Sequence, residues 1–176
     1  KVDDFKCVNI GRRPVIVCRT ASGEIRALLN RCTHRGSMVC AEDHGNTNRF
    51  PCPYHGWVFD NTGELKTVTF AEGYASTFDK AGHNLGRFPR VESYRGYVFG
   101  SLNADVEPLM DWIGPAQELI DWSIDVLNTP GARAVKYGSM VYAGNWKLQN
   151  DNNGDMYHVP FTHRSVGQMT NERHGA

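Results

Sequence analysis

Short apolar runs, rich in β-branched and aromatic residues, occupy much of the first hundred positions of the chain. Such runs predict β-strands, here over Phe5–Ile10, Pro14–Arg19, Ile25–Asn30, Trp57-Val58-Phe59, Glu64–Phe70 and Tyr97–Leu102. Turn-forming residues separate them at Gly11-Arg12-Arg13, Ser22-Gly23-Glu24 and Asp60-Asn61-Thr62-Gly63, and the last of these is a hairpin signal. Several short strands at this spacing predict a small antiparallel barrel or sandwich over residues 1–103.

The hydrophobic period changes after residue 103. Apolar residues between positions 109 and 127 recur at helical spacing, with a break at Gly114-Pro115, which predicts a helical connector over residues 104–130. Val135–Ala143 is again strand-like. We expect a helix over Asn145–Tyr157, with Asn145 as its N-cap and with Pro160 ending it at Val159. The predicted fold class is therefore α+β: a mostly antiparallel β domain, then the start of an α+β domain over residues 131–176.

Composition and charge exclude some classes of protein. The 176 residues carry 19 basic and 19 acidic side chains, so no basic surplus is present to bind nucleic acid. A hydrophobic share of 40% is that of a folded globular protein. No apolar run approaches the ~20 residues of a membrane span. We also expect the chain to be part of something larger, because it opens without Met.

Five cysteines and seven histidines are the candidate chemistry. An odd number of cysteines does not predict a disulfide framework and indicates a reducing, cytoplasmic compartment. Cys7 and Cys18 lie in predicted strands and are expected to be buried thiols, and Cys40 is expected to be a bystander. Three histidines are expected on surfaces or loops: His44, His83 and His174.

Two short ligand motifs lie close together in the first domain. Cys32-Thr33-His34 and Cys52-Pro53-Tyr54-His55 have seventeen residues between them. Zinc sites usually place two to four residues between the ligands of each arm, and the first arm has only one. A [2Fe–2S] cluster fits better, because each loop can give its Cys to one iron and its His to the other. Gly36 and Gly56 would let backbone N–H groups approach the sulfides, and Trp57 could shield the cluster from water.

A second group of possible metal ligands stands near the end of the chain. Asp151, Asp155 and His158 would share one face of the predicted helix, and a turn at Pro160 would bring His163 back towards His158. Two His and a carboxylate are the ligands of non-haem Fe(II) oxygenases, so spacing alone offers Asp155 as a third ligand. Three neighbours are weaker candidates, for the iron pocket or for core packing: Asn152, Met156 and Tyr157.

Both motifs resemble those of the α subunits of Rieske non-haem iron aromatic-ring-hydroxylating oxygenases. The first resemblance runs through Arg31–Gly36 and Cys52–Trp57, and it continues at Tyr94–Asn103, which is similar to the family's closing Rieske strand. The second covers Asn145–His163, whose spacing looks most like the benzoate/anthranilate branch and suggests a carboxylated aromatic substrate. The resemblance implies a Rieske domain over residues 1–103 and a truncated catalytic domain that starts at residue 131.

The resemblance also implies cofactors and residue roles. Cys32, His34, Cys52 and His55 would hold the [2Fe–2S] cluster, and His158 and His163 would hold a mononuclear Fe²⁺ whose third ligand lies beyond Ala176. The residue matching Asp155 is not a ligand in the family. It bridges His158 to the second Rieske histidine, here His55, of a neighbouring subunit. Asp151 departs from the family's usual Glu.

Partners follow from the same resemblance. It implies electrons from NADH through a separate reductase, with or without a ferredoxin, and a homotrimer or an α3β3 assembly with a small β subunit. Substrates would be O2 and an aromatic ring, and a piece of this length would not hydroxylate by itself. Two alternatives stay open: a Rieske monooxygenase or demethylase acting on a non-ring or quaternary amine substrate, and a non-catalytic Rieske electron carrier. The second metal motif argues against the carrier.

Overall fold

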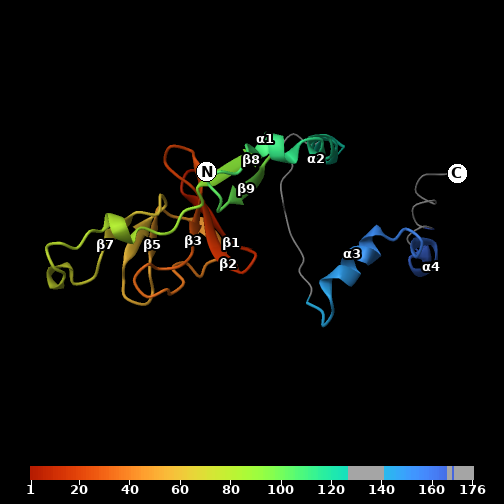
Figure 1. The fold of residues 1–176 in the computed structure, drawn as a ribbon. Coiled ribbons are helices and arrows are strands. Elements are labelled where there is room, and N and C mark those ends of the chain that lie inside the picture. Colours follow the sequence, from red (N-terminus) through yellow and green to blue (C-terminus); the bar gives the residue numbers. More distant parts are fainter. Residues whose placement is uncertain (127–140, 166–167, 169–176) are drawn as a thin grey trace. The chain divides into compact units, whose positions relative to one another are not determined.

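Two compact units make up the chain. The computed structural model describes residues 1–126, 141–165 and 168. The units are Lys1–Ala132 and Arg133–Ala176. All of the described strands belong to the first unit (Figure 1). The finer division into residues 1–103, 104–130 and 131–176 stays a prediction.

A four-stranded antiparallel sheet opens the first unit. Its order is β3-β2-β1-β4, with β1 at Asp4–Ile10, β2 at Arg13–Arg19, β3 at Ile25–Leu29 and β4 at His44–Asn46. The turns after β1 and β2 contain Gly11 and Gly23, both with positive φ, a conformation that glycine adopts at least cost. The three strands predicted before residue 31 are confirmed, and β4 was not predicted.

A three-stranded sheet carries the predicted hairpin. Its order is β5-β6-β7, with β5 at Arg49–Pro51, β6 at Val58–Asp60 and β7 at Leu65–Thr67. In the hairpin, Asp60 Oδ1 accepts the backbone N–H groups of Thr62 at 2.9 Å and Glu64 at 3.0 Å. The strand predicted up to Phe70 is too long, because the chain leaves the sheet after Thr67. Two short 3-10 helices follow: η1 at Ala71–Gly73 and η2 at Ala81–His83.

The core of the first unit lies between these two sheets. Ile16 and Leu28 from the first sheet and Phe50 and Phe59 from the second have exposed fractions of 2% or less, and all four belong to one cluster of buried side chains. The ring of Phe5 meets the ring of Phe50 edge-on, with centroids 5.3 Å apart. This packing joins the loops that follow β3 and β5 to one rigid base.

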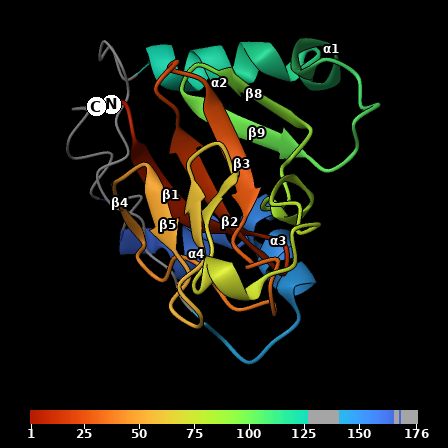
Figure 2. The same cartoon turned by 90° about the vertical axis from the view of Figure 1, so that its left-hand side faces the viewer.

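A hairpin and two helices complete the first unit. Strands β8 at Arg90–Tyr94 and β9 at Tyr97–Ser101 pair with each other, and helices α1 at Leu109–Ile113 and α2 at Ala116–Asp125 follow. The break between the helices is at Gly114, which has φ +50°, so the predicted interruption is confirmed. Figure 2 shows α1 and α2 alongside the hairpin. A side-chain hydrogen bond joins β8 to α2: the hydroxyl of Tyr94 donates to the Asp121 carboxylate at 2.9 Å.

The second unit corrects two predictions. Asn145 caps α3, Trp146–Gly154, by accepting the backbone N–H of Lys147 at 3.1 Å. The helix ends at Gly154 rather than near Val159. Pro160 does not end it but stands in the first turn of a new helix, α4 at Val159–Thr162, where a missing N–H costs nothing. Of the strand predicted at Val135–Ala143, residues 135–140 lie outside the described residues and 141–143 form no strand.

Candidate metal centres

Two loops of nearly identical backbone carry the first ligand motif. The first follows β3 and the second follows β5. In each, a glycine N–H returns to the carbonyl of the cysteine four residues earlier: Gly36 to Cys32 at 2.8 Å and Gly56 to Cys52 at 2.9 Å. Both glycines have positive φ, +79° and +70°. A Cβ on Gly56 would stand 2.7 Å from Thr69 Oγ1, so the second loop also lacks room for a side chain.

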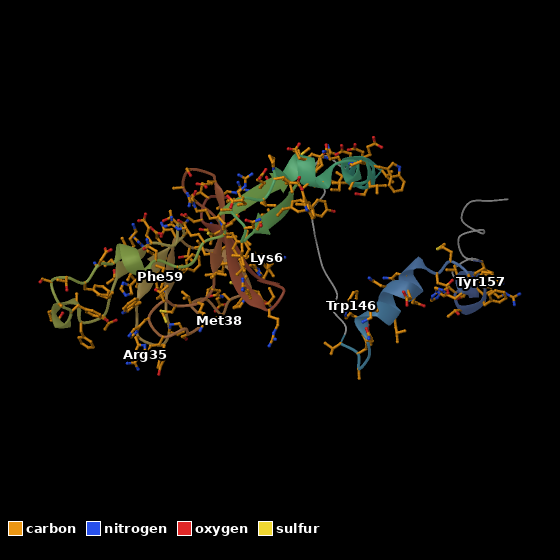
Figure 3. All side chains as sticks on the ribbon, in the orientation of Figure 1. Lys6, Arg35, Met38, Phe59, Trp146 and Tyr157 are labelled. Carbon is orange, nitrogen blue, oxygen red and sulfur yellow. The ribbon has the colours of Figure 1, made fainter. Side chains whose placement is uncertain are left out.

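The loops bring the four predicted cluster ligands to one end of the core. Cys32 and Cys52 are 3% and 2% exposed. The rings of His34 and His55 are half-buried, with centroids 4.6 Å apart at an interplanar angle of 66°. Figure 3 shows Arg35 and Met38 projecting outward from the same region. Two soft thiol donors and two imidazoles therefore meet across the two loops.

The donors fit a two-iron cluster better than a single ion. His34 Nδ1 is buried and has no hydrogen-bond partner, and a bound ion is one explanation for a buried polar atom without a partner. Burial, and then the neighbouring His55, lower the pKa of His34, which favours the neutral imidazole that binds metals. In the described part of the chain, no three His, Cys, Asp or Glu side chains converge on one metal ion. The first arm has only one residue between its ligands, where zinc arms usually have two to four, whereas a two-iron cluster takes its Cys and His donors on separate irons.

Trp57 and His83 also belong to this site. The indole of Trp57 is 2% exposed and stacks on the His34 ring, with centroids 4.7 Å apart and planes within 9°. His83 was expected on a surface or loop. It ends η2, in the connection between β7 and β8, and is half-buried, with its ring 5.7 Å from that of Trp57. The carbonyl of His83 accepts the hydroxyl of Thr33 at 2.5 Å. The spacing of residues in the sequence does not link His83 to the motif, because only the tertiary fold brings η2 next to the first loop.

Asn30 closes the base of the first loop. Its side chain is 2% exposed. Its Oδ1 accepts the backbone N–H groups of Val39 at 2.9 Å and Cys40 at 2.8 Å, and its Nδ2 donates to the Cys40 carbonyl at 2.6 Å. These bonds tie the residue before the loop to the residues after it. Sequence reasoning missed Asn30. The only signal in the sequence is an Asn two positions before the Cys-x-His arm, and its burial is known only from the structure.

The remaining cysteines fit the role of inert thiols. Cys18 is 2% exposed, as predicted, and Cys7 is half-buried. Burial raises the pKa of both thiols to about 12, so they stay protonated and unreactive at neutral pH. Cys40 is buried, and its hydrogen-bonded backbone, not its sulfur, serves the first loop.

The second motif is assembled by a turn rather than by a helical face. Asp155 has left α3 and is extended, so the predicted face of Asp151, Asp155 and His158 is wrong. Its Oδ1 accepts the backbone N–H of Tyr157 at 2.7 Å, and its Oδ2 lies 3.2 Å from His158 Nδ1. The bond from Tyr157 and then that to His158 lower the pKa of Asp155, so it is a carboxylate at neutral pH.

His158 and His163 come together across α4. Their ring centroids are 5.3 Å apart at 70°. Asp155 does not join them as a third arm around one ion. The other predicted candidates face outward: Asn152 is exposed, and Met156 and Tyr157 are 73% and 85% exposed. His44 is exposed, as expected, and His174 lies outside the described residues.

Each part of the chain matches a known protein family. Residues 1–89 match the family described as Rieske [2Fe-2S] domain, and residues 119–176 match that of the ring hydroxylating alpha subunit, catalytic domain. The chain belongs to the Rieske family of ring-hydroxylating oxygenase α subunits. The [2Fe–2S] cluster and the mononuclear iron predicted as cofactors are those of this family. The α+β fold class is likewise confirmed.

Individual relatives agree with this family. The chain is 42% identical over 166 residues to the 2-halobenzoate 1,2-dioxygenase large subunit of Burkholderia cepacia, covering 92% of this chain and 35% of that protein. It is 37% identical over 171 residues to the N,N-dimethyl phenylurea N-demethylase subunit alpha of Sphingobium sp. (strain YBL2), covering 96% and 37%. Naphthalene 1,2-dioxygenase from Rhodococcus sp., bound to indole, superposes with a TM-score of 0.82 at 38% identity, covering 97% and 39%.

These matches cover only part of each relative. The chain spans little more than a third of the length of the relatives it matches. Relatives such as the naphthalene 1,2-dioxygenase system's large oxygenase component are parts of multicomponent systems. No helix in the described part of the chain is long and apolar enough to cross a membrane.

Proposed function

We propose that the first unit holds a [2Fe–2S] cluster on Cys32, His34, Cys52 and His55, with both thiolates on one iron and both imidazoles on the other. One observation carries this proposal: the two loops bring two buried thiols and two histidine rings, 4.6 Å apart, to one end of the core. The unpartnered His34 Nδ1 supports it. The cluster domain would span residues 1–103, with 104–130 as a helical connector to a catalytic domain that begins at residue 131.

We further propose that His158 and His163 are two ligands of a mononuclear Fe²⁺. Because Asp155 Oδ2 engages His158 Nδ1, the Nε2 atom of His158 is left for the metal, which is how a carboxylate orients a histidine ligand. A carboxylate beyond Ala176 would complete the ligand set. Asp155 would have a second role. As a carboxylate it would also accept a hydrogen bond from His55 of a neighbouring copy and so connect the two metal centres.

The reaction that these parts support is the addition of O2 to an aromatic ring. When bound, the cluster supplies single electrons and the mononuclear iron supplies the chemistry of O2. Dihydroxylation consumes O2, two electrons and two protons for each ring. NADH would provide the electrons through a separate reductase, with or without a ferredoxin. A homotrimer or an α3β3 assembly with a small β subunit, in the cytoplasm, would bring neighbouring copies together. A carboxylated ring is the favoured substrate, in line with the halobenzoate relative.

A second candidate function is oxidative N-demethylation. It uses the same cluster and iron residues, and the demethylase relative at 37% identity favours it. The products distinguish the two reactions. Dihydroxylation gives a ring dihydrodiol that contains both atoms of O2, whereas N-demethylation gives an aldehyde and the substrate without one N-methyl group. Isotope-labelled O2 and mass spectrometry of the products distinguish them.

Serine variants test the cluster proposal. Cys32→Ser and Cys52→Ser should each remove the visible absorption and the acid-labile sulfide of the purified protein, because a thiolate ligand is lost. Cys40→Ser is the matched control: this cysteine is also buried and sits eight positions from Cys32, yet it contributes no proposed ligand. A cluster that survives in Cys32→Ser, or is lost equally in Cys40→Ser, would contradict the proposed ligand set.

A further inference from the structure

The two histidines of the first motif have different surroundings. His34 lies flat against the buried indole of Trp57, at 4.7 Å and 9°. His55 lies 3.8 Å from the ring of Tyr54 at 35°, and Tyr54 is 59% exposed. A buried parallel ring excludes water from one whole face of an imidazole, whereas an exposed tilted ring does not. The pair is therefore asymmetric although the loops around it are alike.

Trp57 is held in place on several sides. Its indole N–H donates to the hydroxyl of Tyr74 at 3.2 Å. The rings of Phe78 and His83 meet it edge-on, at 6.0 Å and 5.7 Å between centroids, an arrangement that the quadrupoles of aromatic rings favour. η2 is in turn tied to the first loop through the bond from Thr33 to the His83 carbonyl. The indole plane is consequently fixed relative to the loop that carries His34.

We propose that Trp57 is a positioning residue that sets the ring orientation of His34 by stacking and keeps water from that face. The inference rests on the proposed cluster. His34 Nδ1 has no hydrogen-bond partner and is the nitrogen available to the iron, and an imidazole bound through one nitrogen turns about that bond unless packing or a hydrogen bond at its other nitrogen prevents it. Ring orientation and solvent exposure both tune an iron–sulfur centre. Stacking on Trp57 would add to the His34 ring the kind of constraint that a hydrogen bond at the second ring nitrogen gives to most histidine ligands.

Three variants of the purified protein test this role. Trp57→Leu removes the stacked ring. Phe59→Leu is the matched control, because Phe59 is an equally buried aromatic residue whose ring lies 6.5 Å from that of Trp57 in the same cluster of buried side chains. Trp57→Phe keeps a smaller ring and guards against a Trp57→Leu protein that fails to fold. Iron and sulfide content, the EPR g-values of the reduced protein and the one-electron reduction potential are measured for each.

The expected result separates positioning from general packing. Both leucine variants should lower Tm, but only Trp57→Leu should change the g-values and raise the potential, because water reaching His34 stabilises the more negative reduced form. We expect a threefold to tenfold change in the reduction equilibrium constant, the upper end being about 59 mV. Trp57→Phe should show a smaller shift in the same direction. Wild-type g-values and potential in both Trp57 variants, or equal shifts in Phe59→Leu, overturn the inference. A wild-type protein without cluster overturns the proposed function instead.

Discussion

Replacing Asn30 by Ala should loosen the first cluster loop more than any comparable polar substitution on the surface. Asn30 is 2% exposed, and its amide group holds the backbone of Val39 and Cys40 through three hydrogen bonds of 2.6 to 2.9 Å. Val39 and Cys40 are themselves 4% and 9% exposed. Water therefore cannot replace the lost amide unless the loop opens.

The size of the effect follows from the groups left behind. The substitution strands two buried N–H groups, at about 1–3 kcal/mol each, so we expect a loss of roughly 2–6 kcal/mol in the free energy of unfolding. That is a large share of the ~5–15 kcal/mol that stabilises a typical domain. Cluster content should fall as well, because Cys32 and His34 lie between the two ends that Asn30 joins.

Denaturant unfolding measures the loss, and iron and sulfide analysis measures the cluster content. Asn46→Ala is the matched control. Asn46 also makes side-chain hydrogen bonds, to the Val2 carbonyl at 2.7 Å and to Asp4 Oδ1 at 2.8 Å, but it is exposed. Water can satisfy its partners, so its loss should cost less than about 1 kcal/mol. If Asn30→Ala costs no more than Asn46→Ala and retains full cluster content, burial of this amide is not what holds the loop.

Three further substitutions test other parts of the structure. Asp155→Asn should abolish turnover of the assembled oxygenase while leaving the cluster spectrum intact, because the charge beside His158 is lost; wild-type turnover would refute the bridge. Gly56→Ala should destabilise more than Gly11→Ala in thermal unfolding. Both need positive φ, at about 1–2 kcal/mol, but only Gly56 would also press on Thr69; equal losses would show that the contact relaxes freely. Asp60→Asn should cost about 1 kcal/mol at pH 7. Burial raises the pKa of Asp60, but bonds from Thr62 and Lys66 outweigh it and hold that pKa below its usual value. Because the pKa of Asp60 is lower in the folded state, the carboxylate adds to the free energy of unfolding at pH values above its pKa in the unfolded state, near 4. That contribution is lost as pH falls through the pKa of the folded state. The difference in stability between the two proteins should therefore shrink as pH falls below 4, and a difference that stays the same at every pH would contradict this.

The elements with a strong local sequence pattern were predicted correctly. The segments that became β1, β2 and β3 are apolar, β-branched-rich runs between good turns, and the break at Gly114 divides α1 from α2 as expected. The missed strands carry little such signal. β4 and β5 have three residues each, and β8, Arg90–Tyr94, is half polar, so neighbours along the sheet rather than propensity make them strands.

The site was predicted where its ligands are close in sequence and missed where they are not. Cys32 to His34 and Cys52 to His55 are motifs within single loops, so spacing alone marks them. His83 reaches its place fifty positions from Thr33, which only the tertiary fold arranges. The Asp155–His158 contact was expected for the wrong reason: helical spacing assumes a helix that continues, but α3 ends at Gly154, and a turn makes the contact instead.

The most direct test of the central claim is pulsed EPR of the reduced protein, read for nitrogen coordinated to the cluster. With Cys32, His34, Cys52 and His55 as ligands, the spectrum should contain two strongly coupled ¹⁴N nuclei at two irons and two sulfides per chain. His34→Ala and His55→Ala should each remove one of these two nitrogen couplings. A reduced cluster with no directly bound nitrogen, or a colourless protein holding one zinc ion, would contradict the Rieske ligand set.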